Sequence, residues 1–266
     1  MEVSVLEENK KQNVLSLSIK GSTPAFVNAL RRTIVDEVPT MAIDTVEFQQ
    51  NSSILYDEMV AHRLGLVPLK TDLKSYSMPD EQSEDGEFRA QFHVKLHLKS
   101  KNVGDVLSGE MKSDDPKIVP VFDNLPIVRL AKGKDNQELE FTAVAKLGKG
   151  KQHMKWAPGH VTFKYQPKVD VSKVSDNAED VAKSCPVNVL VHKSGKLSVD
   201  PKKENDCTLC GACVDVSEGV AKLNESNTDF IFNVESWGQL KPTEMGSQAI
   251  DIFDKKLDDF AETLKA

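Results

Sequence analysis

The stretch that decides the fold is Thr23-Pro-Ala-Phe-Val-Asn-Ala-Leu-Arg-Arg-Thr-Ile-Val-Asp-Glu-Val-Pro39. It predicts a helix over 24–38, because the Thr23 hydroxyl can cap the first turn and proline suits the first helical position. Pro39 ends the helix, since proline cannot continue it and restricts the residue before it. Apolar residues recur on one side at helical spacing: Phe26, Val27, Leu30, Ile34 and Val38.

A second long helix is expected to begin near Pro242. Its apolar residues follow one another at spacings of 3, 4, 3 and 4: Ile250, Phe253, Leu257, Phe260 and Leu264. We call these five residues the seam. A seam this narrow favours packing against another helix, and packing on the chain's own core is the alternative. The seam covers only about two heptads, so we expect it to form one part of an interface.

Between the two helices, alternating apolar and polar residues predict a series of strands. We expect the strands at 3–5, 14–20, 42–49, 92–99, 118–121, 127–130, 139–147, 161–165 and 230–234. A short helix is expected over 55–64, and the acidic stretch 70–88 is expected to be a surface loop. The sequence therefore predicts an α+β protein that is rich in strands from about 46 to 166.

Composition excludes several classes of protein. The chain has 266 residues, 39% of them hydrophobic, and a net charge of −7, which argues against a protein that grips nucleic acid by itself. No stretch approaches the roughly 20 apolar residues of a membrane span, and the acidic N-terminus lacks the basic region of a signal peptide. We therefore expect a cytoplasmic protein with no membrane contact, in which cysteines serve as metal ligands more often than as disulfides.

The four cysteines predict an iron–sulfur site. Cys207, Cys210 and Cys213 have the Cys-x-x-Cys-x-x-Cys spacing that wraps a cluster, and Cys185 is the candidate fourth ligand. The segment 185–199 resembles the hairpin that joins ferredoxin motifs. We expect one cluster, [4Fe–4S] or [3Fe–4S]. Zinc on the same four cysteines is the alternative, and a disulfide could form without a cluster.

Residues for catalysis do not form a recognisable group in the sequence. Gly148-Lys-Gly150-Lys lacks the full phosphate-binding pattern, the six histidines are scattered, and no acidic triad is visible. We therefore predict that the chain has no catalytic residues of its own.

Four segments, in order along the chain, resemble the alpha-type assembly subunits of multisubunit RNA polymerases: 26–43, 54–69, 147–158 and 234–238. Met154 departs from the family, which often has alanine there. The cysteine-rich part resembles that of the archaeal members of the family, in which we expect the subunit to be designated D. Bacterial alpha subunits lack this part.

The resemblance implies three domains. A split dimerisation domain, with an antiparallel sheet and two long helices, would comprise 1–45 and 225–266. A β-rich insert would comprise 46–168, and a small ferredoxin-like iron–sulfur domain would comprise 169–224.

The resemblance also implies partners. Helices 24–38 and 247–264 would pack against subunit L through Phe26, Leu30, Ile34, Ile250, Phe253, Leu257, Phe260 and Leu264. The insert would face the second-largest catalytic subunit and the small subunits N and P, and DNA would be met only through the assembled polymerase. We assign Arg31 and Arg32 to the interface with the large subunit, because arginine suits bidentate contacts with carboxylates.

Three functions remain open on the sequence. The chain is an assembly scaffold with a stabilising cluster, a scaffold whose assembly is regulated by the cluster, or a ferredoxin-like electron-transfer protein. A lone cluster and the absence of a flavin or nicotinamide fingerprint favour the two scaffolds over electron transfer.

Overall fold

A computed structural model describes residues 1–78, 92–132, 136–174 and 177–265. The expected loop 70–88 therefore lies partly outside the described residues. The chain divides into two compact units, each made of three segments. The first comprises Met1–Glu7, Ser16–Asn28 and Thr162–Asn233, and the second comprises Glu8–Leu15, Ala29–Val161 and Val234–Ala266.

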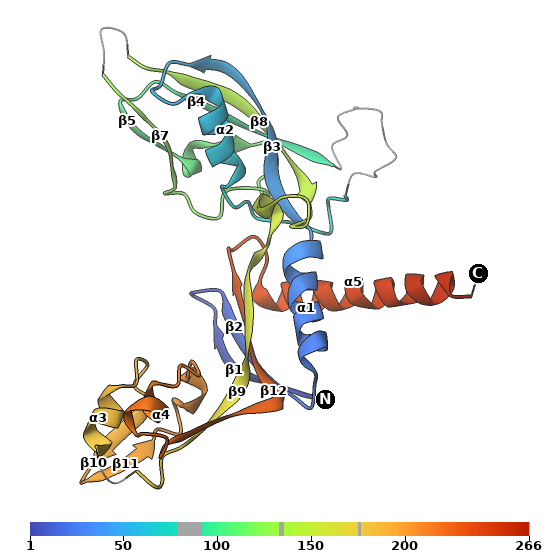
Figure 1. Ribbon diagram of the computed structural model, residues 1–266. Helices are drawn as coiled ribbons and strands as arrows, with labels where there is room; N and C mark the ends of the chain where they lie inside the picture. Colours follow the sequence, from blue (N-terminus) through green and yellow to red (C-terminus); the bar gives the residue numbers. More distant parts are fainter. Residues whose placement is uncertain (79–91, 133–135, 175–176, 266) are drawn as a thin grey trace. The chain divides into compact units, whose positions relative to one another are not determined.

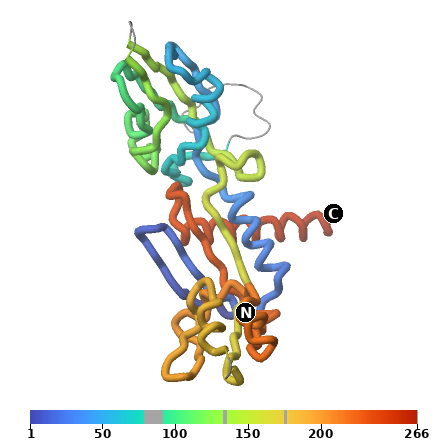
Figure 2. The backbone as a smooth tube through the Cα atoms, turned by 60° about the vertical axis from the view of Figure 1, so that its left-hand side comes forward, coloured from blue at the N-terminus to red at the C-terminus, as the bar shows by residue number. Residues whose placement is uncertain are grey.

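The first unit contains most of a four-stranded sheet with the order β1-β2-β12-β9. Its strands are β1 (Glu2–Asn9), β2 (Val14–Lys20), β9 (Gly159–Asp170) and β12 (Lys222–Ser236). β1 and β2 lie side by side as a hairpin, which Figure 2 shows in blue. β2 has the predicted bounds, whereas β9 and β12 are longer than predicted. Backbone pairing extends the start of β12 through mainly polar residues, whereas the end of β9 does alternate, with Pro167 and Val169 buried.

The rest of the first unit consists of short elements that surround a small core. They are α3 (Ala178–Lys183), β10 (Leu190–Lys193), β11 (Lys196–Val199), η3 (Glu204–Asp206) and α4 (Ala212–Val216). β10 and β11 form an antiparallel hairpin with Leu190 opposite Val199, inside the segment 185–199. The core contains Val181 and Val189 together with two of the cysteines. The ferredoxin-like character of this part stays a prediction.

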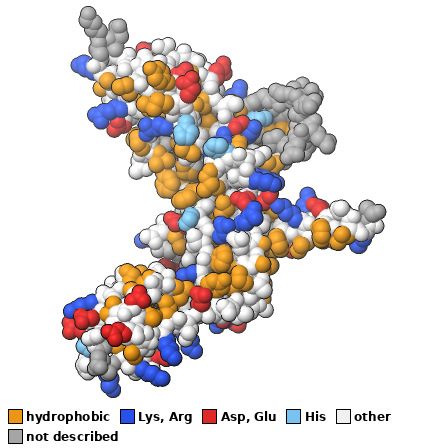
Figure 3. Space-filling view, viewed as in Figure 1, with side chains coloured by type: hydrophobic (Ala, Val, Ile, Leu, Met, Phe, Trp, Pro, Cys, Tyr) orange, Lys and Arg blue, Asp and Glu red, His pale blue; other side chains and the backbone are white. Residues whose placement is uncertain are grey.

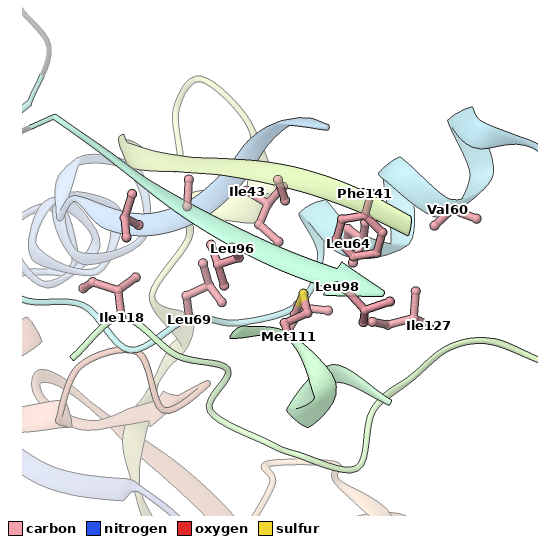
Figure 4. Close-up of a cluster of buried hydrophobic side chains, with 14 of the residues drawn as sticks. Ile43, Val60, Leu64, Leu69, Leu96, Leu98, Met111, Ile118, Ile127 and Phe141 are labelled. Carbon is pink, nitrogen blue, oxygen red and sulfur yellow. The ribbon is translucent and has the colours of Figure 1, made fainter. Parts of the chain in front are cut away.

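The second unit contains an antiparallel sheet with the order β3-β8-β4-β6. Its strands are β3 (Thr40–Asn51), β4 (His93–Ser100), β6 (Lys112–Ser113) and β8 (Leu139–Gly148). The other elements of this part are α2 (Asp57–Gly65), β5 (Gly104–Leu107), η1 (Ser108–Glu110), β7 (Pro126–Leu130) and η2 (Met154–Trp156). Figure 4 shows Leu64 of α2 together with Phe141 of β8 and Leu98 of β4 in one core cluster.

The predicted strand over 118–121 is wrong. Only Pro120 makes a bridge there, with Leu69. Proline lacks the N–H that a strand ladder needs. Ile118 is apolar because the loop inserts it into the core, where it is fully buried.

Two helices complete the architecture, α1 (Pro24–Glu37) and α5 (Pro242–Thr263), labelled in Figure 1. The N–H of Phe26 donates to the Thr23 hydroxyl at 3.3 Å, which confirms the predicted cap. Antiparallel sheets and two long helices confirm the predicted α+β class. None of the described helices is both long enough and apolar enough to cross a membrane.

Candidate functional site

α5 and Leu264, the residue that directly follows it, carry the seam, which is largely exposed. Four of its five residues are more than half exposed: Ile250 at 52%, Leu257 at 51%, Phe260 at 62% and Leu264 at 72%. Phe253 is half-buried. The buried residues of the helix, Met245 and Ala249, lie near its start. Figure 3 shows hydrophobic side chains in a row along one side of α5. The alternative that the seam packs on the chain's own core is therefore wrong for these four residues.

On α1, only some of the residues that were predicted to form the interface are exposed. Phe26 is 37% exposed and Leu30 is half-buried. Ile34 is only 1% exposed, so its placement in the interface needs correction. It shares a buried side with Val27 and Val38, which lie seven residues before it and four after it. The helix therefore turns Ile34 into the chain's own core and leaves Phe26 accessible.

The two arginines of α1 differ in exposure. The Arg32 side chain is 67% exposed, and its Nε lies 3.5 Å from Oδ2 of Asp36, one helical turn further on. Arg31 is half-buried. An exposed pair of this kind contributes little to stability, so Arg32 can exchange Asp36 for another carboxylate at little cost. The assignment of both arginines to a large-subunit interface stays a prediction.

Glu37 connects the end of α1 to α5. Its carboxylate accepts hydrogen bonds from Lys256 Nζ at 2.7 Å and Lys149 Nζ at 3.2 Å, and its side chain is 12% exposed. Burial by itself would raise the pKa of Glu37, but the two lysines outweigh it and hold the pKa below its ordinary value. No local sequence pattern predicts this contact, because 219 residues separate Glu37 from Lys256.

A further cluster of exposed apolar residues lies just before α2 and in its first turn. Ile54 is 82% exposed, Tyr56 is 77% exposed and Met59 is 50% exposed. None of these three side chains was predicted as a contact residue, although they lie in the segment 54–69 that resembles the family. A concentration of exposed apolar residues on one short segment is typical of a contact surface.

The structure brings all four cysteines to one small hollow. Cys185, Cys207, Cys210 and Cys213 line it together with apolar side chains such as Val189. Cys207 and Cys213 are buried, Cys185 is half-buried and Cys210 is exposed. The loop that carries the last three cysteines turns sharply, since Leu209 (φ 58°) and Gly211 (φ 79°) both adopt left-handed backbone angles.

Some groups around the cysteines favour a thiolate, and others oppose it. The N–H of Val189 donates to Cys185 Sγ at 3.3 Å, and Lys164 Nζ donates to the Cys207 carbonyl at 3.0 Å. Burial raises the pKa of the Cys213 thiol, and the neighbouring Cys207 raises it further. Burial also lowers the pKa of Lys164.

Four sulfur donors with apolar walls and a nearby cation match the chemistry of an iron–sulfur site. Among the described residues, however, no three or more His, Cys, Asp or Glu side chains are grouped closely enough to hold a metal ion. The four cysteines therefore line one hollow, but in this structure they are not close enough together to bind a metal ion.

Comparison with known proteins places the chain in a family. Residues 16–257 match the RNA polymerase Rpb3/Rpb11 dimerisation domain. Among its relatives, the DNA-directed RNA polymerase subunit Rpo3 of Pyrococcus furiosus is 39% identical and covers 100% of this chain and 97% of its own length. The Rpo3 subunit of Pyrococcus horikoshii is 38% identical, with 96% and 95% covered. That of Methanosphaera stadtmanae is 36% identical, with 97% and 96% covered.

These relatives correct the expected letter of the subunit and confirm its family. They carry the name Rpo3 in place of the expected letter D. The alpha-type family and the dimerisation domain agree with the resemblance of the segments between 26 and 238. The chain belongs to the RNA polymerase Rpb3/Rpb11 dimerisation-domain family.

Proposed function

We propose that the chain is a non-catalytic assembly subunit of a DNA-dependent RNA polymerase, and that it forms a heterodimer through α5 and the accessible part of α1. The exposed seam of α5 carries this proposal, because it lies within a chain that matches a dimerisation domain. A row of large apolar side chains in water is unfavourable, and a second amphipathic helix would remove it from water. The relatives named as polymerase subunits give no support to the electron-transfer alternative.

The partner that we propose for the seam is subunit L. Coiled-coil-like spacing suits a matching helix, and the half-exposed Phe26 and Leu30 would extend the same contact onto α1. The β-rich part would face the second-largest catalytic subunit and subunits N and P, for which the exposed Ile54 and Tyr56 offer apolar contacts. DNA would be met only through the assembled enzyme, in the cytoplasm.

Purified chain mixed with purified subunit L tests the central proposal. We expect a single complex with one copy of each chain in size-exclusion chromatography with light scattering. If the chain stays alone, or pairs only with itself, the proposal fails. Arg31→Ala/Arg32→Ala should leave this complex intact and weaken docking of the large subunit, since the arginines lie off the seam. Unchanged recovery of whole polymerase would refute their assignment.

We also propose that the four cysteines hold one iron–sulfur cluster, [4Fe–4S] or [3Fe–4S], whose binding stabilises the small domain around α3 and α4. The shared hollow and the sharply turned cysteine loop support this. A core this small benefits from metal ligation, because few apolar side chains are available to it. The cluster could also regulate assembly, if its loss alters the surface of this domain.

Metal analysis of anaerobically purified chain tests the cluster. We expect iron and acid-labile sulfide, with loss of both in Cys207→Ser/Cys213→Ser. If the chain contained zinc and no iron, the four cysteines would be a zinc site and the iron–sulfur proposal would fail. If oxygen-treated chain still binds subunit L but no longer enters the polymerase, the cluster regulates assembly. If assembly is unchanged, the role of the cluster is limited to stabilising its domain.

A further inference from the structure

β1 forms one edge of the four-stranded sheet with the order β1-β2-β12-β9. Among the described residues it pairs only with β2, so the N–H and C=O groups along its outer side have no neighbouring strand. The residues from Glu2 to Glu7 belong to the first unit, and all of them are exposed. Val3 is 53% exposed and Val5 is 63% exposed, and strand alternation places both on one face. An exposed edge with apolar side chains is a template for a further strand.

The other edges of the two four-stranded sheets carry features that oppose further pairing. β3 has two register shifts against β8, one at Asp44 and one at Gln49, and shifts of this kind twist an edge strand. β6 is only two residues long. β9 contains Pro167, which lacks the N–H that a strand ladder needs. β1, by contrast, is eight residues long and contains neither proline nor lysine, two residues that commonly protect an edge.

The charge of β1 determines which strand can pair with it. The strand contains three glutamates and no basic residue. Antiparallel pairing of two copies of β1 would place Glu2 of one copy opposite Glu7 or Glu8 of the other, and parallel pairing in register would place each glutamate beside its counterpart. Like charges directly opposite each other in a sheet are destabilising, whereas opposite charges are stabilising. The edge therefore disfavours a second copy of this chain and favours a strand that carries lysine or arginine.

We propose that the outer edge of β1, from Glu2 to Glu7, binds an extended basic segment of another polymerase subunit, which joins the sheet as a fifth strand. This rests on the proposed function, because it requires the chain to assemble with other polymerase subunits. Hydrogen bonds from the backbone of β1 supply most of the affinity, and Val3 and Val5 contact β-branched side chains of the added strand. Lysine or arginine of that strand pairs with Glu2 and Glu7. The edge contains no seam residue, so the added strand and the partner of α5 use different groups of the chain.

Hydrogen exchange at single residues tests the added strand directly. Successive N–H groups of a strand point to opposite sides, so only alternate N–H groups between Glu2 and Glu7 face away from β2. We expect these outward groups to exchange about 100-fold more slowly in the assembled polymerase than in the free chain. Exchange takes place in the whole enzyme, which is then quenched, dissociated and analysed by mass spectrometry with electron-transfer fragmentation. If the outward groups exchange equally fast in the polymerase, or if all residues of β1 gain protection equally, the proposal fails.

Glu7→Lys tests the charge of the added strand. The variant and the wild-type chain, with different tags, are mixed in equal amounts with the other purified subunits of the polymerase. We expect the variant to be depleted about three- to tenfold in the assembled enzyme, because an opposite-charge pair across two strands becomes a like-charge pair. The Tm of the free variant should change little, since Glu7 is exposed.

Glu225→Lys is the matched control. Glu225 is also an exposed glutamate in a strand of the first unit, but it lies in β12, which is not an edge of the sheet. This variant should enter the polymerase as well as the wild type. Equal incorporation of Glu7→Lys, or equal depletion of both variants, would overturn the proposal. A wild-type chain that does not assemble at all would refute the proposed function first.

A photo-crosslinker identifies the added strand. Val5→p-benzoylphenylalanine in the assembled polymerase should crosslink to a segment of another subunit that is rich in basic and β-branched residues. The same substitution at Val220, which is 44% exposed and lies outside the strands of the first unit, should not reach that segment. A crosslink from position 5 only to a second copy of this chain, to an acidic segment or to no protein would overturn the proposal.

Discussion

α1 and α5 carry similar apolar spacing but use it in opposite ways. On α1, Val27 and Ile34 are at most 1% exposed, so the helix is part of the chain's own core. On α5, Leu257 and Phe260 are more than half exposed. Helical periodicity therefore identifies which residues share a side, but it does not identify what covers that side. The next experiments test whether the two helices have separate roles in folding and in assembly.

The largest effect is expected from the seam. Leu257→Asp/Phe260→Asp should lower affinity for subunit L by about 1,000-fold, about 4 kcal/mol, because two apolar side chains of the proposed interface become charged. The Tm of the free chain should change little, since both side chains face solvent. Asp254→Asn/Asp258→Asn, on the same helix but off the seam, is the control for light scattering and calorimetry. A large drop in Tm with unchanged affinity would contradict the role of the seam.

Ile34 on α1 should behave in the opposite way. Ile34→Ala should lower the free energy of unfolding by about 2–4 kcal/mol, because it leaves a cavity in a well-packed core. Denaturant unfolding of the free chain measures this. Phe26→Ala, on the accessible side of α1, should change stability by less than about 1 kcal/mol and should reduce affinity for subunit L. Equal stability losses in the two variants would mean that α1 does not divide its sides in this way.

Substitutions at two glycines test how closely each helix is packed. A Cβ on Gly150 would lie 2.0 Å from the Val35 carbonyl near the end of α1, whereas nothing lies within 4 Å of a Cβ on Gly246 in α5. Gly150→Ala should therefore destabilise the chain by about 1–3 kcal/mol, because backbone must move. Gly246→Ala should stabilise it by about 0.5–1 kcal/mol through helix propensity. Thermal unfolding distinguishes the two, and stabilisation by both would refute the close contact at α1.

The smallest effect is expected where the two helices meet. Glu37→Gln should lower the free energy of unfolding by about 0.5–1 kcal/mol at neutral pH, since it weakens the ion pairs to Lys149 and Lys256. The pKa of Glu37 is lowered in the folded chain. Its contribution is therefore complete above the ordinary carboxyl pKa of 4.5 and is lost as the pH falls through the folded value.

Urea unfolding across the acid range tests this linkage. The difference between wild type and Glu37→Gln should shrink as the pH falls below 4.5, the ordinary value for this carboxyl. Glu47→Gln removes an exposed carboxyl on β3 and serves as the control. A difference that is constant with pH would show that Glu37 contributes packing and not charge.

Local signals accounted for most of the elements. Thr23, Pro24 and Pro39 define the ends of α1 within one turn, and alternation located β2, β4 and β8 within one or two residues. The same method was wrong at 118–121, where apolar residues pack as a loop, and it shortened β12, whose polar half is held by backbone pairing. Hydrogen bonds to neighbouring strands do not depend on side-chain type, so the side-chain pattern did not reveal them.

The sequence by itself determined the two helices, the seam, the cysteine spacing and the family, because each depends on short stretches of neighbouring residues. Only the tertiary structure decided that Ile34 is core while Leu257 is exposed, and that Glu37 meets Lys256. These facts depend on contacts between residues that are distant in the chain. Burial and pairing of that kind are properties of packing, which no local pattern contains.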